Sequence, residues 1–346
     1  MSENFITSTL NKKDQARDNS LRPSDFKDFP GQEREKEKLQ LYTAAAKQRG
    51  EALGHLLLSG PPGLGKTTLA YIIANEMGTN IKSSSGPAIE KPGDLAGLLT
   101  SLQAGDILFI DEIHRLNNTV EEYLYSAMED YFIDIMLDQG PGARSVRLNV
   151  ERFTLIGATT RQGMLTAPLR SRFGMSCRLE LYEPKDLKTI IHRSAGILGV
   201  SIDDAGAYEI ASRCRGTPRI ANSLLRWARD YAQIKENHKI NKTIANAALE
   251  MYDIDSDGLD RMDNRLLEII IKFYHGGPVG LKTLAVAVGE EDRTIEDVYE
   301  PYLIQEGFLM RTPQGRIAAP RAWQKLGLKP PANSKGIDHN QPELFE

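Results

Sequence analysis

The amino-acid sequence predicts an α/β fold at the start of a 346-residue chain. Three short apolar runs, at 55–58, 107–110 and 153–156, are spaced along its first half. Between them lie segments in which apolar residues recur at helical spacing. Short apolar strands that alternate with helices indicate a parallel sheet covered by helices on both faces.

The composition is that of a folded chain, with 40% apolar and 26% charged residues. No apolar run is long enough to cross a bilayer, and the first twenty residues lack the apolar core of a signal peptide. We therefore expect a cytoplasmic protein without membrane contact. Cys177 and Cys214 are the only cysteines, which excludes a disulfide framework and a Cys-rich zinc site. The net charge of −4 gives no global indication of nucleic-acid binding.

The predicted large domain spans 21–182 and follows a tail, 1–20, that we expect to be flexible. Within 33–49 apolar residues recur at i, i+3, i+4 and i+7, which predicts a helix. Further helices are expected up to residue 77 and over 119–131.

One segment of this domain, 132–150, departs from the alternation of strands and helices. Ile133, Ile135 and Leu137 alternate with other residues, as do three apolar residues at its end, and the stretch Gln-Gly-Pro-Gly lies between the two halves. This pattern predicts an inserted β-hairpin. Its exposed apolar residues favour a partner surface, although the hairpin could instead pack only on its own domain.

The second half of the chain divides into two modules and a tail. Residues 183–255 read as a small helical domain that ends in an acidic hinge at 253–258. Within 256–330, helices are predicted over 264–274, 281–288 and 294–306, and two short strands follow around Pro313-Gln314-Gly315. Three helices and a two-stranded ribbon indicate a winged helix-turn-helix. Residues 331–346 are polar, and we expect them to be flexible.

The segment 60–67, GPPGLGKT, fits the phosphate-loop pattern and lies between an apolar strand and a helix. Its glycines let several backbone N–H groups converge on phosphates, and the helix N-terminus faces the same anion. Lys66 would approach the β- and γ-phosphates. Thr67 offers a hydroxyl to Mg²⁺, and Thr68 can reach the α-phosphate.

Two further strand ends carry polar residues that suit ATP hydrolysis. Asp111 and Glu112 follow a buried strand, where Asp111 can hold Mg²⁺ and Glu112 can polarise the attacking water. Thr160 follows the next strand and could sense the γ-phosphate, although an ordinary strand-end threonine fits equally. His114 is better explained as an orienting or surface residue than as a metal ligand.

Three arginines are candidates for stabilising the transition state. Arg170 and Arg172 precede a turn and could reach the ATP of a neighbouring subunit, whereas Arg219 opens a helix of the small domain and could reach the ATP of its own subunit. The alternatives are surface arginines in a loop and, for Arg219, a salt bridge.

The motifs GPPGLGKT, LFIDEIH, GATT, PLRSRFG and GTPRIAN together resemble those of AAA+ ATPases. With the inserted hairpin and the winged helix, the chain is similar to the RuvB family over residues 20–330. The resemblance implies an AAA+ P-loop parallel sheet with an inserted β-hairpin, a small helical lid and a C-terminal winged helix. It also implies a homohexameric ATP-dependent motor on double-stranded DNA at four-way Holliday junctions, which drives branch migration in recombination, repair and the SOS response. RuvA would dock on hairpin 132–150, RuvC is a further candidate partner, and ATP and Mg²⁺ are the expected cofactors.

The resemblance assigns roles residue by residue. The adenine pocket would be lined by Leu21, Arg22 and Tyr182. The phosphates would be held by Gly63, Gly65, Lys66, Thr67 and Thr68. The Walker B pair would be Asp111 and Glu112, and the first and second sensors would be Thr160 and Arg219. Arg172 would be the arginine finger, with Arg170 as the rival. The stretch Glu129, Asp130 and Tyr131 would lie near a nucleotide across the subunit interface.

Basic residues gather near the end of the winged module. Between residues 307 and 329 the chain has five basic residues and no Asp or Glu. Arg311 and Arg316 flank the predicted turn, so we expect both on an exposed wing that contacts DNA phosphates, with Arg293 as a further contact. The alternative is a winged helix that docks a protein.

Two other classes of function compete with a DNA translocase. An AAA+ clamp loader often carries a zinc-binding cysteine cluster, which two distant cysteines exclude, and initiators more often end in a different helix-turn-helix. A nucleotide-dependent scaffold that does not hydrolyse ATP has no need of Glu112, Thr160 and the arginines.

Overall fold

The computed structural model describes residues 20–136, 145–235 and 239–330, which form two compact units, 18–246 and 247 onward. The predicted tails 1–20 and 331–346 lie almost wholly outside the described residues. The tip of the hairpin at 139–142 and the helix break predicted at Asn237 lie outside them as well.

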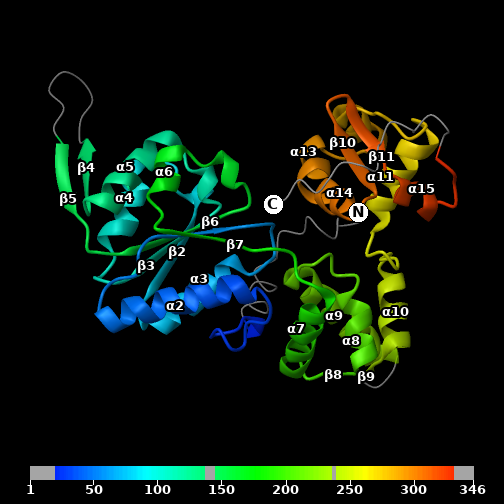
Figure 1. The fold of residues 1–346 in the computed structure, drawn as a ribbon, viewed down its shortest axis with the longest axis horizontal. Coiled ribbons are helices and arrows are strands. Elements are labelled where there is room, and N and C mark those ends of the chain that lie inside the picture. The colour runs from blue at the N-terminus through cyan, green and yellow to red at the C-terminus, as the bar shows by residue number, and fades with distance from the viewer. Residues whose placement is uncertain (1–19, 137–144, 236–238, 331–346) are drawn as a thin grey trace. The chain divides into compact units, whose positions relative to one another are not determined.

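The first unit is built on a five-stranded parallel sheet with the order β2-β3-β6-β1-β7 (Figure 1). Its strands are β1 (Leu56–Ser59), β2 (Ile81–Ser85), β3 (Ile107–Asp111), β6 (Thr154–Thr159) and β7 (Met175–Arg178). The apolar runs predicted as strands are β1, β3 and β6, which lie in the middle of the sheet. The edge strands β2 and β7 were not predicted, because β2 reads IKSSS and both are only partly buried.

Helices cover the sheet on both faces, with α2 and α3 on one side and α4 and α5 on the other (Figure 1). The longer ones are α2 (Glu33–Arg49), α3 (Lys66–Met77), α4 (Pro92–Thr100) and α5 (Asn118–Glu129). Shorter turns are η1 (Gly86–Ala88), η2 (Ile113–Arg115), η3 (Gln162–Met164) and α6 (Ala167–Ser171). The α5 helix ends before the predicted residue 131, because Tyr131 adopts a left-handed backbone with φ 56°.

The inserted hairpin is present as β4 (Phe132–Met136) paired antiparallel with β5 (Ser145–Asn149). The expectation of exposed apolar residues holds for Val146, which is 39% exposed. It is wrong for Ile133, which is fully buried, and Ile135 and Leu148 also pack against the core of the domain. One face of the described hairpin is therefore part of the domain core.

A helical bundle completes the first unit and runs into the second. Its elements are α7 (Pro184–Ile197), β8 (Ser201–Ile202), α8 (Asp204–Ala211), α9 (Pro218–Lys235), β9 (Lys239–Ile240) and α10 (Lys242–Met251). The short parallel pair β8–β9 was not predicted, because each strand has only two residues.

The second unit has the predicted helices and ribbon around its own core (Figure 1). Its elements are α11 (Arg261–Lys272), α12 (Leu281–Val288), α13 (Asp292–Thr294), the π-turn η4 (Ile295–Tyr299), α14 (Glu300–Gln305), β10 (Leu309–Thr312), β11 (Gly315–Ala318) and α15 (Pro320–Lys325). The strands β10 and β11 pair antiparallel, and Arg316 of β11 also bridges to Val279. No helix in the described ranges is both long and apolar enough to cross a membrane.

Candidate functional site

The phosphate loop connects β1 to α3, and its glycines are required by close backbone contacts. A Cβ on Gly60 would lie 2.4 Å from the carbonyl oxygen of Leu179, and Gly60 has φ 137°. Gly65 caps α3 with φ 96°, and a Cβ there would lie 3.1 Å from the Phe29 ring. Because a side chain at either position would collide or strain the backbone, the loop needs glycine to bend towards the start of α3.

Lys66 is the first residue of α3 and is only 7% exposed. Its Nζ donates hydrogen bonds to the carbonyl oxygens of Gly60 and Pro61, both at 2.8 Å. Burial lowers the pKa of Lys66 to about 8; the negative field of Asp111 opposes this shift, and Arg219 adds to it. A buried ammonium that neutral carbonyl oxygens hold is suited to an anionic ligand.

Asp111 ends β3, and Glu112 follows it directly; in the sheet order β3 lies two strands from β1, which leads into the phosphate loop. The backbone N–H of Glu112 donates to Oδ1 of Asp111 at 2.9 Å. Glu112 itself has a left-handed backbone, with φ 48°, and its carboxylate accepts a hydrogen bond from Arg115 at 2.8 Å. Such backbone strain is common at functional sites, and here it turns the glutamate out of the strand direction.

The strand between these two, β6, ends at Thr159, and Thr160 follows it. Thr159 is buried, and its hydroxyl lies 3.0 Å from Nδ1 of His114. Burial lowers the pKa of His114. Thr160 is exposed at the tip of the strand, so it is the threonine of this pair that faces outward. The ends of β1, β6 and β3 thus bring Lys66, Thr160 and Asp111 to one edge of the sheet.

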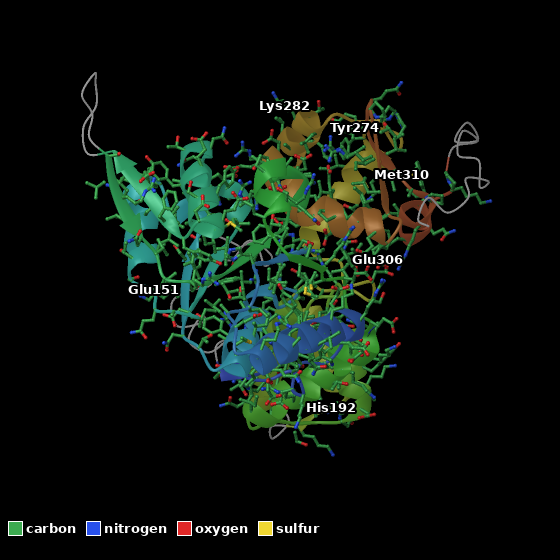
Figure 2. The ribbon with its side chains drawn as sticks, turned by 60° about the vertical axis from the view of Figure 1, so that its left-hand side comes forward. Glu151, His192, Tyr274, Lys282, Glu306 and Met310 are labelled. Atoms are coloured by element: carbon green, nitrogen blue, oxygen red, sulfur yellow. The ribbon has the colours of Figure 1, made fainter. Side chains whose placement is uncertain are left out.

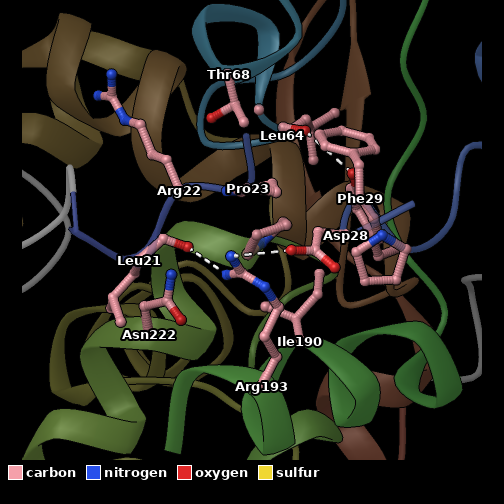
Figure 3. A pocket seen from close by; sticks show the side chains of 14 residues that line it. Leu21, Arg22, Pro23, Asp28, Phe29, Leu64, Thr68, Ile190, Arg193 and Asn222 are labelled. Carbon is pink, nitrogen blue, oxygen red and sulfur yellow. Dashed lines mark hydrogen bonds and ion pairs between the residues drawn. The ribbon is translucent and has the colours of Figure 1, made fainter. Parts of the chain in front are cut away.

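A hollow that is open to solvent on one side lies beside the phosphate loop (Figure 3). It is lined by the predicted Leu21, Arg22, Gly65, Thr68 and Tyr182, and also by Pro23, Asp28, Phe29, Pro30, Leu64, Ile190, Arg193, Pro218 and Asn222. Leu64, Pro218 and Asn222 belong to the motifs GPPGLGKT and GTPRIAN, but the other residues of this second group were missed, because no motif marks them. The polar lead-in of residues 21–32 was the available signal.

Hydrogen bonds fix the walls of this hollow. Arg193 of α7 donates to the carbonyl oxygen of Leu21 at 2.7 Å, and its guanidinium lies 3.8 Å from the carboxylate of Asp28. The hydroxyl of Tyr182, which is buried, donates to the carbonyl oxygen of Leu64 at 3.3 Å. The N-terminal segment, the phosphate loop and the helical bundle therefore all contribute to one pocket.

Arg219 lies in the first turn of α9, against the phosphate loop. Its backbone N–H donates to the carbonyl oxygen of Gly63 at 3.4 Å, and a Cβ on Gly63 would lie 3.1 Å from the Cβ of Arg219. Together with its influence on the pKa of Lys66, this places Arg219 at the same site as the phosphate loop.

Arg172 lies elsewhere in the first unit, directly after α6. Its guanidinium donates to the carbonyl oxygen of Pro168 at 2.8 Å and to the carboxylate of Glu129 at 3.0 Å. Asp130, which follows Glu129, and Arg170, which lies two residues before Arg172, are both exposed. Within the described residues, Arg172 has no recorded contact with the phosphate loop, so the structure does not bring it to the ATP site of its own chain.

Three family models together match almost the whole chain. The Holliday junction DNA helicase RuvB P-loop domain matches residues 21–179, the RuvB AAA lid domain 182–255, and the RuvB C-terminal winged helix domain 256–327. The chain belongs to the RuvB family.

Individual RuvB proteins resemble the whole chain as well. The Holliday junction branch migration complex subunit RuvB of Streptomyces avermitilis is 54% identical over 99% of this chain and 96% of its own length. The solved RuvB Holliday junction branch migration motor of Thermotoga maritima is 51% identical and has a TM-score of 0.81. The match covers 90% of this chain and all of that one. A single-substitution variant of the same protein gives 52% identity and a TM-score of 0.82, over 90% and 99% of the two chains.

In this RuvB-family chain, the winged helix differs from the prediction in one respect: Arg316 is not on an exposed wing. It is 8% exposed, and its guanidinium pairs with the buried carboxylate of Glu300 at 2.5 Å. The reason is register. Arg311 and Arg316 are direct partners across β10 and β11, so both face the preceding helix, where Arg311 pairs with Glu296 at 2.6 Å. The expectation that Arg316 lies on an exposed wing is therefore wrong.

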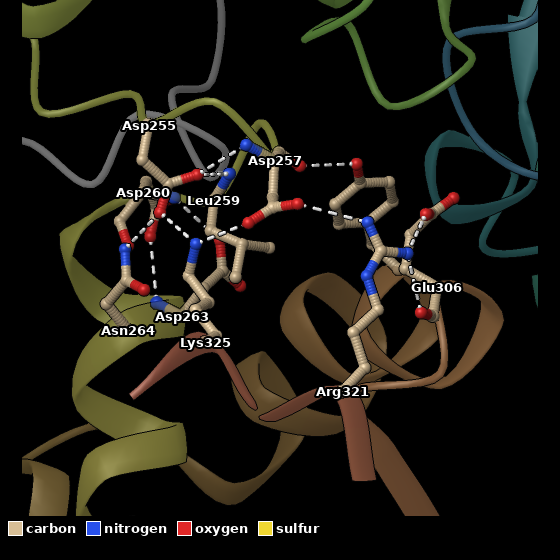
Figure 4. Close-up of polar contacts among 10 residues, drawn as sticks. Asp255, Asp257, Leu259, Asp260, Asp263, Asn264, Glu306, Arg321 and Lys325 are labelled. Carbon is tan, nitrogen blue, oxygen red and sulfur yellow. Dashed lines mark hydrogen bonds and ion pairs between the residues drawn. The ribbon is translucent and has the colours of Figure 1, made fainter. Parts of the chain in front are cut away.

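Two other basic residues near the end of this RuvB-family chain are paired too. Lys325 lies 2.8 Å from Asp255 and 2.6 Å from Asp257, and Arg321 lies 3.0 Å from Asp257 and 2.7 Å from Glu306 (Figure 4). The segment predicted as an acidic hinge is thus fastened to the winged-helix unit. The local charge of +5 is largely cancelled by carboxylates that come from elsewhere in the chain.

Exposed cations remain on this RuvB winged helix. Arg293 is exposed near the start of its third helix. Lys282, which the sequence analysis did not single out, is exposed at the start of α12 (Figure 2). The third helical segment itself, from α13 to α14 over residues 292–305, carries four carboxylates and one arginine. Such a helix is repelled by phosphates and is poorly suited to enter a DNA groove.

Proposed function

We propose that this chain is an ATP-driven motor that moves Holliday junctions along double-stranded DNA. Support comes from family membership together with one observation: the charges of Asp111, Glu112 and Arg219 all act on the buried Lys66, beside a hollow that phosphate-loop residues help to line. A site that only bound nucleotide would not require a strained glutamate next to the Mg²⁺ carboxylate.

The adenine would lie in the hollow against Leu21, Arg22 and Tyr182. The phosphates would be bound by the N–H groups of the loop at Gly63 and Gly65, by Lys66, and by the hydroxyls of Thr67 and Thr68. Binding would exchange the carbonyl partners of the Lys66 ammonium for phosphate oxygens, which form stronger charge-assisted hydrogen bonds.

Magnesium fits the oxygen donors at this site. Thr67 and Asp111 supply a hydroxyl and a carboxylate, and Mg²⁺ completes its shell with water and phosphate oxygens. The described ranges contain no cluster of three His, Cys, Asp or Glu side chains, and this kind of site does not need one. When bound, Mg²⁺ neutralises charge on the β- and γ-phosphates.

The chain's own groups would then carry the hydrolysis. Glu112, released from Arg115, would orient water and accept its proton as the water oxygen bonds to the γ-phosphorus, while the bond from the γ-phosphorus to the β–γ bridging oxygen breaks and ADP leaves. Thr160 would hold that water or a γ-oxygen. Arg219, on the helical lid, would contact the γ-phosphate and transmit its loss to lid movement.

We also propose that Arg172 completes the ATP site of the next subunit in a homohexamer. The residues Glu129, Asp130 and Tyr131 would face that same interface. Arg170 is the rival of Arg172, but only Arg172 is held in a defined position by its neighbours.

DNA and protein partners follow from the same proposal. Arg311 and Arg293 would contact DNA phosphates. RuvA would dock on the hairpin 132–150, where Val146 offers exposed apolar surface. RuvC is a further candidate in the same complex, and the protein would act in the cytoplasm in recombination and DNA repair.

A combined ATPase and four-way-junction unwinding assay tests the proposal. We expect ATP-dependent unwinding that increases when RuvA is added, and loss of both activities in Glu112→Gln, which should still bind ATP. Unwinding without ATP hydrolysis, or hydrolysis that neither junction DNA nor RuvA affects, contradicts a motor.

A further inference from the structure

The surroundings of Arg172 contain a partly buried polar cluster that no motif marks. It consists of Glu121 and Tyr125 on α5 and of Thr166, which caps the N-terminus of α6. The Tyr125 hydroxyl donates to Glu121 Oε2 at 2.7 Å, Thr166 donates to the same oxygen at 2.8 Å, and the two hydroxyls lie 2.8 Å apart. Glu121 is only 3% exposed, so its charge depends on these two donors.

This cluster determines where α6 lies. The helix has five residues, Ala167–Ser171, too few to hold a direction by its own hydrogen bonds. Its position is fixed at the start by Thr166, which accepts a hydrogen bond from Leu169 N at 3.3 Å, and by the fully buried Leu169. Because Arg172 directly follows α6, a shift of Thr166 is passed on to Arg172.

Tyr125 also touches Arg172 directly. The guanidinium carbon of Arg172 lies 4.5 Å from the centre of the Tyr125 ring, within the range of a cation–π contact. The Arg172 side chain is 21% exposed, whereas its carboxylate partner Glu129 is 55% exposed. A pair with an exposed carboxylate contributes little and is readily exchanged. The ring, together with the carbonyl oxygen of Pro168 and not Glu129, is therefore the fixed support of the guanidinium.

We propose that Tyr125 is the positioning residue of Arg172. Its ring supports the guanidinium, and its hydroxyl, held by Glu121 and Thr166, fixes the helix that carries the arginine. Glu129 is the exchangeable partner, which an anion on a neighbouring subunit replaces. This inference rests on the proposed role of Arg172 in trans. It adds that the guanidinium of Arg172 is already oriented before it meets the ATP of the neighbouring subunit. This orientation matters because small displacements of a catalytic group reduce the rate by large factors.

Two substitutions separate the two functions of Tyr125. Tyr125→Phe keeps the ring and removes the hydroxyl, and we expect kcat for ATP hydrolysis to fall about threefold. Tyr125→Leu removes both, and we expect a fall on the order of tenfold. The KM for ATP and the affinity for nucleotide should not change, because Tyr125 lies outside the pocket lining. Tyr123→Phe and Tyr123→Leu, on the same helix, are the matched controls and should leave kcat within twofold of the parent protein.

Hexamers assembled from two different variants test whether the fall in kcat of Tyr125→Leu acts through Arg172. Glu112→Gln subunits cannot hydrolyse ATP but keep an intact Arg172, so adding them to Tyr125→Leu subunits should restore hydrolysis at the Tyr125→Leu sites. Arg172→Ala mixed with Glu112→Gln is the reference and should recover in the same way. If only the reference mixture recovers, Tyr125 acts elsewhere and the inference is wrong, while the trans role stands. If neither recovers, the trans role fails and the inference fails with it.

Folding is checked on the same proteins. Melting temperature and ring assembly are measured for each variant, and if Tyr125→Leu does not fold, the comparison of Tyr125→Phe with Tyr123→Phe decides. An unchanged kcat in a folded Tyr125→Phe hexamer, with no difference from Tyr123→Phe, overturns the inference.

Discussion

The nucleotide site and the winged-helix unit each bury one cation, and they treat it in opposite ways. Lys66 is 7% exposed, and its ammonium is held by the backbone carbonyl oxygens of Gly60 and Pro61, whereas Arg316 is 8% exposed and contacts the carboxylate of Glu300. Burial alone therefore does not distinguish a binding group from a structural one. The partner does: a cation held by neutral oxygens still attracts an anion, and one held by a carboxylate is already neutralised.

The largest effect that this comparison predicts is on folding, at Arg316. Arg316→Met leaves Glu300 buried without its partner, so we expect the free energy of unfolding to fall by about 3–5 kcal/mol. Chemical denaturation measures it, with Arg311→Met as the matched control because Arg311 is half exposed and should change stability by less than about 0.5 kcal/mol. The double variant Arg316→Met/Glu300→Leu should regain most of the loss. Equal stability of the two single variants would contradict a structural role of Arg316.

Lys66 should show the reverse behaviour. Lys66→Met removes the charge that binds phosphate, so we expect ATP affinity to fall about a hundredfold, as loss of a charge-assisted contact implies. Its stability without nucleotide should be equal or higher, because the buried ammonium is unfavourable there. Calorimetric titration and denaturation of the same sample measure both. A destabilised Lys66→Met with normal ATP affinity would make Lys66 a structural residue.

The pH dependence of nucleotide binding sharpens the same contrast. Burial lowers the pKa of Lys66 to about 8, so the nucleotide-free protein loses this charge as pH rises through 8. We expect ATP affinity to be about tenfold weaker at pH 9 than at pH 7. The stability contribution of Lys66 has the opposite sign: between about 8 and 10.5 the unfolded chain binds more protons, so that contribution rises with pH. Lys66→Arg, which does not titrate in this range, should lose the pH dependence; if it persists, another group is responsible.

The sequence predicted the central sheet and the nucleotide site because their signals are local. The strands β1, β3 and β6 are continuous apolar runs, and the residues of the loop and of the strand ends follow them directly. Parallel pairing then brings these ends together without further information. The edge strand β2 was missed because its polar sequence carries no such signal.

The winged helix shows where local reasoning fails. Residues 307–329 do carry a local charge of +5. The carboxylates that compensate it lie outside this segment and belong to Asp255, Asp257, Glu296, Glu300 and Glu306. Only the fold brings these groups to the arginines and lysines. Strand register places both wing arginines on the face towards the acidic helix. A count of charges along the sequence cannot predict this register.

The smallest predicted effect concerns Arg311. Its exposed pair with Glu296 is intermediate between Lys66, which neutral oxygens hold, and Arg316, which a buried carboxylate neutralises. Because the pair is half exposed, phosphate can compete for the guanidinium, so Glu296→Gln should strengthen duplex binding a few-fold and Arg311→Ala should weaken it a few-fold. Arg311→Ala should also reduce the slope of log affinity against log salt by about 0.9, evenly across DNA sequences. Fluorescence anisotropy at several salt concentrations measures both, with Glu268→Gln, which breaks an exposed pair on α11, as the control. If Glu296→Gln leaves binding unchanged while Arg311→Ala weakens it, Glu296 does not compete with DNA for the arginine. If neither variant changes binding, Arg311 is a paired cation of the same kind as Arg316, and the DNA contacts of this unit lie on other residues such as Arg293 and Lys282.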